Sequence, residues 1–255
     1  MSSGIAALPR GQDQDPLRIA IIGASGRMGR ALARLATEYG IEVAIGIDAG
    51  DDFDALGRAG ASVAIDFSAP LATRALAAVA TRAKVAIVSG TTGLDEAARG
   101  ALDAASEHVP VMWEPNMSIG VHVLGELVRR AMDALGPGFD VEIVETHHRL
   151  KADAPSGTAV RLAEIAREAR ADRTHLQHGR EGRPGARSSA EIGMHAVRGG
   201  DVIGDHSVHL LGAGERIELV HRASSRDLFA HGALRAARWI AGRPAGRYAM
   251  RQIIE

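Results

Sequence analysis

Residues 17–29 read LRIAIIGASGRMG, a short apolar run that ends abruptly in a turn containing three glycines. After this turn, alanine and leucine recur at helical spacing between Ala31 and Ala36, and Gly40 follows as a natural C-terminal cap. A dinucleotide site requires a strand, a glycine turn and a helix in this order. The glycines let the backbone approach the pyrophosphate, and the helix N-terminus attracts its charge. The stretch therefore predicts the first strand and helix of a Rossmann-like fold.

The glycine spacing, G-x-x-G-x-x-G, differs from the commoner G-x-G-x-x-G and by itself also suits an ordinary strand-to-helix turn. The next apolar run, Ile41–Ile47, favours the dinucleotide site because it ends in Asp48, where an acid is expected to bond the ribose. No cation follows this acid at Ala49, so we expect a preference for NADH; Arg27 could reach a 2′-phosphate, which keeps NADPH as an alternative. The residues expected to bind the cofactor here are Gly23, Ala24, Ser25, Gly26, Arg27, Met28 and Asp48.

Strand-like and helical segments continue to alternate up to about residue 118. Apolar runs at 62–67, 84–88 and 109–113 alternate with helical patterns at 71–83 and 94–108. This order predicts a doubly wound parallel sheet, in which ligands bind beyond the carboxyl ends of the strands. Two short turns fall at such ends and are expected to line the nicotinamide side of the site, although similar turns often serve as plain connections. They contain Gly90, Thr91 and Thr92, and Glu114, Pro115, Asn116 and Met117.

The pattern changes after residue 118. A long amphipathic helix is expected at 119–135, a strand from Phe139 to Val144, and a second helix from Ser156 to about Ala171. A loop is expected at 172–189. Three strand-like runs follow, separated by glycine turns and therefore expected to be antiparallel. They are Ile192–Val197, Asp201–Leu211 and Arg216–His221.

These segments predict an α/β chain with two domains. Residues 16–118 would form a dinucleotide-binding domain, joined again by residues 227–255, which include a helix at 227–241. Residues 119–226 would form a substrate-binding and oligomerisation domain, an α+β fold with an open mixed sheet. The uncovered face and edges of that sheet favour packing against further copies of the chain. Residues 1–15 are expected to be a disordered extension.

Composition excludes several classes of protein. Lysine and arginine number 30 against 31 acidic residues, so neither nucleic acid nor a membrane surface is an expected partner. The absence of cysteine excludes disulfides, thiolate metal sites and a cysteine nucleophile. No apolar run reaches the ~18 residues of a membrane helix, and the first residues lack the pattern of a signal peptide, so we expect a cytoplasmic protein. The arginines between Arg170 and Arg198 suggest a solvated loop, with anion binding as the alternative.

Residues 145–159 read ETHHRLKADAPSGTA and place titratable side chains beside a predicted helix start. His147, His148 and Lys151 follow the strand, and Ser156 suits the N-cap of the next helix. The amides of its first turn can bond an anion, which together with the lysine and a histidine predicts a substrate that carries carboxylates. Plainer interpretations are a buried histidine bonded to backbone groups and a solvated lysine.

A metal site is not expected. His147 and His148 are adjacent, so their side chains diverge and cannot easily chelate one ion. His206 and His209 lie in a strand-like run and would point to opposite faces of it.

The same stretch resembles the signature E-x-H-H-x-x-K-x-D-x-P-S-G-T-A of the dihydrodipicolinate reductase family. The turn at 23–29 and the blocks at 66–68, 90–92, 116–118, 199–206 and 223–226 resemble that family too, so the resemblance runs from about Leu17 to the C-terminus. It implies NAD(P)H-dependent reduction of 4-hydroxy-tetrahydrodipicolinate to tetrahydrodipicolinate, in diaminopimelate and lysine biosynthesis, by a homotetramer.

The resemblance also implies roles for individual residues. His147 matches the family's proton donor and acceptor, and Lys151 its proton donor. The family's residues that contact the substrate carboxylates correspond to His148, Gly157 and Thr158. Met117 stands where many members carry Phe, Glu114 where many carry a small residue, and Ala49 where members using both cofactors carry Arg.

Two rival functions are open to the same fold. Another two-domain NAD-dependent amino-acid dehydrogenase would not need His-His-x-x-Lys followed by Ser-Gly-Thr. A non-catalytic NAD-sensing module would be expected to have lost part of the polar site, and here every position of the site is filled.

Overall fold

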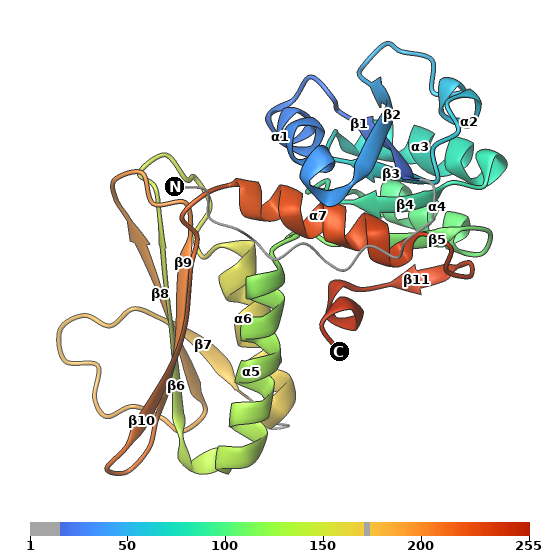
Figure 1. Ribbon diagram of the computed structural model, residues 1–255. Helices are drawn as coiled ribbons and strands as arrows, with labels where there is room; N and C mark the ends of the chain where they lie inside the picture. Colours follow the sequence, from blue (N-terminus) through green and yellow to red (C-terminus); the bar gives the residue numbers. More distant parts are fainter. Residues whose placement is uncertain (1–15, 171–173) are drawn as a thin grey trace. The chain divides into compact units, whose positions relative to one another are not determined.

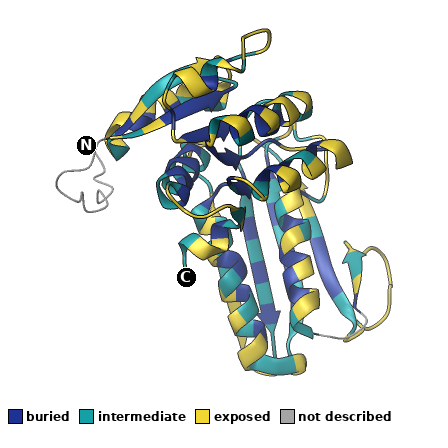
Figure 2. Cartoon of the chain, turned by 90° about the vertical axis from the view of Figure 1, so that its right-hand side faces the viewer, coloured by how far each residue is buried: buried dark blue, intermediate teal, exposed yellow. Residues whose placement is uncertain are grey.

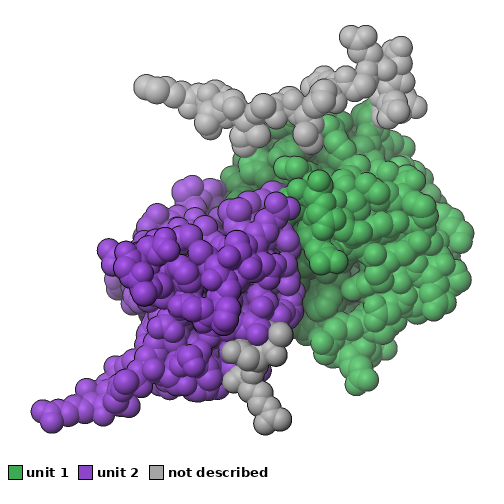
Figure 3. Space-filling model, turned by 90° about the horizontal axis from the view of Figure 1, so that it is seen from below, with its two compact units in different colours: residues 1–118, 227–255 green, residues 119–226 purple. Residues whose placement is uncertain are grey.

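A computed structural model describes residues 16–170 and 174–255 of the chain (Figure 1). The described residues form two compact units, shown in different colours in Figure 3. Unit 1 comprises the described residues up to Ser118 together with Asp227–Glu255, and unit 2 comprises Ile119–Arg226. The expected N-terminal extension at 1–15 lies outside the described residues.

Unit 1 is built on a parallel sheet of six strands in the order β11-β5-β4-β3-β1-β2. Its strands are β1 (Leu17–Ile22), β2 (Ile41–Ile47), β3 (Val63–Asp66), β4 (Ala86–Ser89), β5 (Pro110–Trp113) and β11 (Gly246–Tyr248). The chain first runs from β1 to β2 on one side and then returns to β3 on the other, so the strand order reverses beside β1, as in a doubly wound fold. The Rossmann-like sheet predicted from the sequence is confirmed.

Helices cover both faces of this sheet. They are α1 (Arg27–Ala36), α2 (Ala55–Arg58), α3 (Pro70–Ala83), α4 (Glu96–Ser106) and α7 (Asp227–Ile240), with short 3₁₀ segments at Thr37–Tyr39 and Met250–Ile253. Ala20 and Ile22 of β1 belong to one buried cluster with α3 and α4. The alternate residues Ile19 and Ile21 are equally buried and face the other side, where α7 packs on α1 and on β3 to β5 (Figure 1).

Unit 2 contains a mixed sheet of five strands in the order β10-β9-β6-β8-β7. The strands are β6 (Asp140–His147), β7 (His175–His178), β8 (Glu191–Arg198), β9 (Asp205–Leu211) and β10 (Arg216–Arg222). Two helices, α5 (Ile119–Leu135) and α6 (Gly157–Arg170), pack with the apolar residues of the three central strands in one core, and a 3₁₀ turn (Gly136–Gly138) follows α5. Figure 2 shows the buried residues concentrated on the sheets and the outer sides of the helices exposed.

The strands β8, β9 and β10 alternate in direction, as the sequence predicts, but β9 does not lie next to β8. Strand β8 runs parallel to β6, which separates it from β9; only β9 and β10 form an antiparallel hairpin. The glycines at 199–200 begin a longer connection that carries the chain past β6, and β9 accordingly starts at Asp205 and not at Asp201. Side-chain alternation shows which face of a strand is buried, but it does not identify the neighbouring strand.

The expectation of a loop throughout 172–189 was wrong. His175–His178 forms the edge strand β7, parallel to β8. Its sequence, HLQH, contains a single apolar residue and gives no period-2 signal. In addition, no helix in the described part of the chain is long and apolar enough to cross a membrane.

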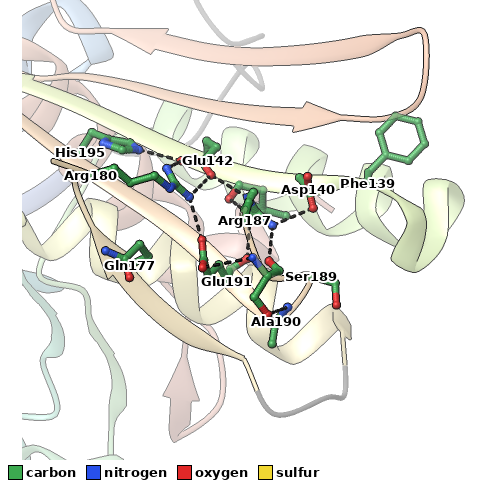
Figure 4. Close-up of polar contacts among 12 residues, drawn as sticks. Phe139, Asp140, Glu142, Gln177, Arg180, Arg187, Ser189, Ala190, Glu191 and His195 are labelled. Carbon is green, nitrogen blue, oxygen red and sulfur yellow. Dashed lines mark hydrogen bonds and ion pairs between the residues drawn. The ribbon is translucent and has the colours of Figure 1, made fainter. Parts of the chain in front are cut away.

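Two of the arginines expected to be solvated, Arg180 and Arg187, are instead bonded to the face of the sheet opposite α5 and α6 (Figure 4). Glu142 of β6 accepts hydrogen bonds from Arg180 at 2.8 Å, from Arg187 at 2.9 Å and from His195 at 2.7 Å. Arg187 also donates to Asp140 at 2.7 Å. This cluster holds the segment between β7 and β8 against the sheet.

Candidate active site

The turn between β1 and α1 is as tight as its glycines predict. Gly23 has a φ of 82°, and a Cβ atom there would lie 2.6 Å from the carbonyl oxygen of Phe67. A Cβ at Gly29 would lie 2.3 Å from the carbonyl oxygen of Gly23, so α1 can approach the turn only with glycine at this position. Gly26 caps α1, whose first turn carries no acidic side chain. The helix end therefore keeps its positive character, which suits a pyrophosphate.

Asp48 directly follows β2 and is bonded to the same turn. The backbone N–H of Ser25 donates to both carboxylate oxygens at 3.0 Å, and the Ser25 hydroxyl donates to one of them at 2.9 Å. Arg27 is exposed on the first turn of α1. The residues predicted at 23–28 and Asp48 thus lie together at the carboxyl ends of β1 and β2.

A buried carboxylate that was not predicted as a site residue organises the neighbouring turns. Asp66 ends β3 and accepts hydrogen bonds from the hydroxyls of Ser68 and of Ser89, the latter at 2.8 Å. The backbone N–H of Ser68 donates to the hydroxyl of Thr91 at 3.0 Å. The predicted turn at 90–92 is thereby joined to the turn after β3. An acid at the end of an otherwise apolar strand was the available sequence signal.

The second predicted turn, at 114–117, follows β5. Glu114 accepts a hydrogen bond from the backbone N–H of Met250 at 3.1 Å, and the side chain of Asn116 accepts one from the N–H of Ser118 at 2.9 Å. Met117 is 1% exposed, so its side chain belongs to the interior of the protein. Both turns lie at carboxyl ends of parallel strands, as the sequence predicts.

In unit 2 the last residues of β6 carry the titratable groups. The alternation that turns the apolar residues of β6 toward the helices also turns Glu145 and His147 inward, and both are buried. His147 is in register with Arg198 of β8, and Glu145 is in register with His206 of β9. Three neighbouring strands therefore present these four side chains on one face of the sheet.

Glu145 is the centre of this group. One carboxylate oxygen lies 2.5 Å from Nδ1 of His147 and accepts a bond from Arg198 at 2.8 Å. The other accepts bonds from Arg198 at 2.9 Å and from the backbone N–H of Ser156 at 3.0 Å. A fully buried carboxylate is stable only with such partners, because an unpaired buried charge is costly.

Ser156 is the N-cap of α6, as predicted. Its hydroxyl accepts a hydrogen bond from the N–H of Ala159 at 3.2 Å and lies 3.1 Å from Nε2 of His206. The ring of His206 stands at 77° to the ring of His147, with centroids 5.2 Å apart. Gly157 is the first residue of α6 and is exposed, and a Cβ atom there would meet nothing within 4 Å among the described residues. The start of α6 is therefore open to an anion beside the histidines.

Burial and the neighbouring groups together shift the pKa values of Glu145 and His206. Burial alone raises the pKa of Glu145, but hydrogen bonds from Arg198, His147 and the Ser156 backbone outweigh it and hold the pKa below its usual value. Burial, aided by the nearby His147, lowers the pKa of His206 to about 4. At neutral pH the group thus contains an ionised Glu145 and an uncharged His206.

Lys151 and His148 lie in the turn after β6. The ammonium group of Lys151 contacts both carboxylate oxygens of Asp153, at 2.7 and 2.9 Å, and the Lys151 N–H donates to the carbonyl of His148 at 3.1 Å. The hydrogen bond from Lys151 is the main cause that lowers the pKa of Asp153. His148 is half-buried whereas His147 is buried, so the two side chains diverge as expected.

Sequence reasoning predicted the two histidines, the lysine and the cap, but it assigned no role to Glu145, Arg198 or His206. The signal was present for Glu145, since residues 141, 143, 145 and 147 alternate and the first two are apolar. Arg198 could not be found this way, because its pairing depends on which strand lies next to β6.

The Rossmann-type sheet has a glycine turn bonded to an acid at the end of the next strand, and the α+β unit of the same chain holds a buried histidine–carboxylate pair. This combination is typical of a two-domain nicotinamide-dependent oxidoreductase. The chain matches the family models "Dihydrodipicolinate reductase, N-terminus" over residues 17–117 and "Dihydrodipicolinate reductase, C-terminus" over residues 120–254. It belongs to the dihydrodipicolinate reductase family.

Similar proteins agree with this family. A 4-hydroxy-tetrahydrodipicolinate reductase of Myxococcus xanthus is 44% identical over 93% of this chain and 97% of its own length. One of Thiobacillus denitrificans is 44% identical over 93% of this chain and 98% of its own length. Among solved structures, the dipicolinate-bound dihydrodipicolinate reductase of Paenisporosarcina sp. TG-14 shares the fold, with a TM-score of 0.73 and 23% identity over 92% of this chain and 98% of that chain.

Proposed function

We propose that this protein reduces 4-hydroxy-tetrahydrodipicolinate to tetrahydrodipicolinate in diaminopimelate and lysine biosynthesis. One NAD(P)H and one proton are consumed for each substrate molecule, and one NAD(P)⁺ and one water are released. The observation that carries the proposal is the buried Glu145–His147 pair beside the Ser156-capped start of α6. It supports both a proton transfer and the binding of a carboxylate. No observation favours another amino-acid dehydrogenase or a non-catalytic sensor.

The residues of unit 1 fit a nicotinamide dinucleotide. The turn at Gly23 and Gly29 is too tight for any side chain, and the end of α1 lacks an acidic residue that would repel phosphate. Asp48 stands at the carboxyl end of the neighbouring strand, where it would accept hydrogen bonds from a ribose. When bound, the cofactor supplies the hydride.

The residues of unit 2 would hold the substrate and move its proton. His148, Gly157 and Thr158 would bind the carboxylates, since they lie at the turn and at the helix start where an anion is stabilised. His147 would exchange the proton with the substrate, and Lys151, held by Asp153, would act as a second proton donor. A positioned acid of this kind accelerates a reaction by about 10²- to 10⁴-fold.

Three finer features belong to the same proposal. NADH is the preferred cofactor, because Ala49 offers no charge to a 2′-phosphate, although Arg27 is exposed nearby and NADPH remains usable. The protein works as a homotetramer in which the open face of the second sheet packs against other copies. Its place of action is the cytoplasm.

The proposal is tested by a coupled assay in which a purified synthase condenses pyruvate with aspartate semialdehyde and NADH oxidation is followed after this protein is added. We expect NADH loss that requires both the synthase and this protein. Absence of oxidation above background, with NADH and with NADPH, would show that the proposed function is wrong.

Two variants separate proton transfer from binding. His147→Gln should lower kcat by about 10²-fold or more with a modest change in KM, because it removes a group that acts in the transition state. Thr158→Val should mainly raise KM. If both variants change only thermal stability, these residues have a structural role alone.

A further inference from the structure

The ring of His147 has two nitrogen atoms in very different surroundings. Nδ1 lies 2.5 Å from the carboxylate of Glu145. Nε2 points toward Gly204: a Cβ atom at that position would lie 3.0 Å from Nε2 and 3.4 Å from the adjacent ring carbon. Within the described part of the chain, no residue makes a hydrogen bond to Nε2. The backbone of Gly204 thus leaves space at one nitrogen while a carboxylate occupies the other.

The partners of Glu145 decide which nitrogen carries the proton. Arg198 and the Ser156 backbone donate three hydrogen bonds to the carboxylate, and neither group can lose its proton under ordinary conditions. Glu145 is therefore an acceptor only, and the neutral imidazole must bring its proton to Nδ1. The ring cannot turn over without losing this bond.

We infer that Glu145, paired with Arg198, is a positioning residue that fixes His147 in the tautomer protonated on Nδ1 and reserves Nε2 for proton exchange with the substrate. The identity of the substrate in this inference rests on the proposed function, whereas the tautomer follows from the hydrogen bonds of Glu145 alone. Gly204 contributes to the same arrangement, because any side chain at this position would occupy the space through which a substrate atom must approach Nε2 of His147.

The decisive variant is Glu145→Gln. One oxygen position receives two donors, from Ser156 and Arg198, and the position facing His147 receives a single donor, from Arg198. The amide oxygen should therefore take the first position and turn the amide NH₂ toward His147. An amide N–H facing Nδ1 would require the other tautomer, with the proton on Nε2. We expect kcat to fall by about 10²- to 10⁴-fold, with a much smaller change in KM.

The tautomer is measured directly by ¹⁵N NMR of histidine side chains in the full-length protein, with His147 assigned by comparison with His147→Gln. In the wild type the signals should show the proton on Nδ1, and in Glu145→Gln they should move toward the form protonated on Nε2. A wild-type His147 protonated on Nε2 would overturn the inference without any variant. So would a Glu145→Gln enzyme with unchanged kcat, or one that loses activity while keeping the wild-type tautomer.

Glu142→Gln is the matched control. Glu142 lies on the same strand but on the opposite face, and like Glu145 it is bonded to arginine and histidine, in its case Arg180, Arg187 and His195. This variant should lower stability while the His147 tautomer and kcat stay unchanged; an equal loss of kcat in both variants would assign Glu145 a merely structural role. Gly204→Ala should lower kcat/KM by about 10²-fold or less with the tautomer retained.

Failure of this inference is distinguishable from failure of the proposed function. If the wild type oxidises neither NADH nor NADPH in the coupled assay, the proposed reaction is wrong, and the NMR measurement still decides how Glu145 acts on His147. If the wild type is active and its tautomer is the opposite one, the reaction stands and the positioning role is wrong.

Discussion

Gly157 is the residue at which stability and binding should change in opposite directions. It is the exposed first residue of α6, its φ lies outside the left-handed region, and a Cβ atom there would meet no described residue within 4 Å. Gly157→Ala should raise the free energy of unfolding by up to about 1 kcal/mol, because alanine favours a helix. The added methyl group would stand between the helix start and a substrate carboxylate.

The expected kinetic result for Gly157→Ala is a rise in KM of roughly tenfold, the equivalent of one weakened hydrogen bond to a charged group. Thermal denaturation and steady-state kinetics on the same preparation check both effects. A higher melting temperature with unchanged KM would mean that the carboxylate does not bind at this helix start.

Cofactor choice is likewise a property of single residues. Ala49 is exposed directly after Asp48, so Ala49→Arg should place a guanidinium group near a 2′-phosphate. We expect the wild type to have a higher kcat/KM with NADH than with NADPH. In the variant, kcat/KM with NADPH should rise by about tenfold, the effect of one new ion pair with a phosphate. A wild type that prefers NADPH would contradict the assignment.

For single residues, the sequence predicted which side chains belong to the site better than it predicted their hydrogen-bond partners. The histidines, the lysine and the Ser156 cap stand in one continuous stretch, which local reading can find. Arg198 lies far along the chain and meets Glu145 only because β8 pairs with β6 in parallel register. That pairing depends on the whole sheet, so no local pattern reveals it.

At the scale of elements, β6 carries a charged cluster on each face. On the open face, burial raises the pKa of Glu142, but hydrogen bonds from Arg180, His195 and Arg187 outweigh it and hold the pKa at about 2. This pKa lies below the value of 4.5 for an ordinary glutamate. The cluster therefore stabilises the fold fully above pH 4.5, and this contribution is lost as the pH falls toward 2.

The measurement for this cluster is the melting temperature of the wild type and of Glu142→Gln between pH 7 and pH 3. The variant should melt at a lower temperature at neutral pH, and the difference should shrink as the pH falls through the window below 4.5. Two curves that stay parallel would show that the charge of Glu142 does not contribute.

The elements themselves were predictable to different degrees. Apolar or periodic patterns predict the strands β1 to β5 and the helices α1, α3, α4 and α7 of unit 1 closely, whereas the four-residue helix α2 was not predicted. β7 and β11 are short edge strands with few apolar residues, so they leave no such pattern. Arg187 was expected to be exposed to solvent, because an arginine in a segment rich in glycine and serine usually lies in a solvated loop. It is instead bonded to two carboxylates of the neighbouring strand β6, those of Glu142 and Asp140.

At the scale of the whole molecule, the open face of the second sheet bears on assembly. Val197 and Val220 lie on strand positions that face away from α5 and α6, and they are 47% and 39% exposed. Apolar side chains on an uncovered sheet face favour contact with other copies. For the proposed homotetramer, light scattering should give about four times the 26.7 kDa of one chain.

Val220→Glu should shift this mass toward smaller species, because a charge would be buried without a partner. Leu71→Glu, which replaces an exposed apolar residue on α3 of unit 1, serves as the control and should leave the mass unchanged. A wild type that scatters as a single chain would contradict the assembly.

NADH deuterated at the transferred position shows whether this chain passes a hydride from a nicotinamide to the substrate ring. The product formed in the coupled assay is then analysed by mass spectrometry. We predict that tetrahydrodipicolinate made by the wild type carries one deuterium, and that His147→Gln makes the same labelled product far more slowly. Unlabelled product, or no product above the reaction without protein, would rule out this hydride transfer.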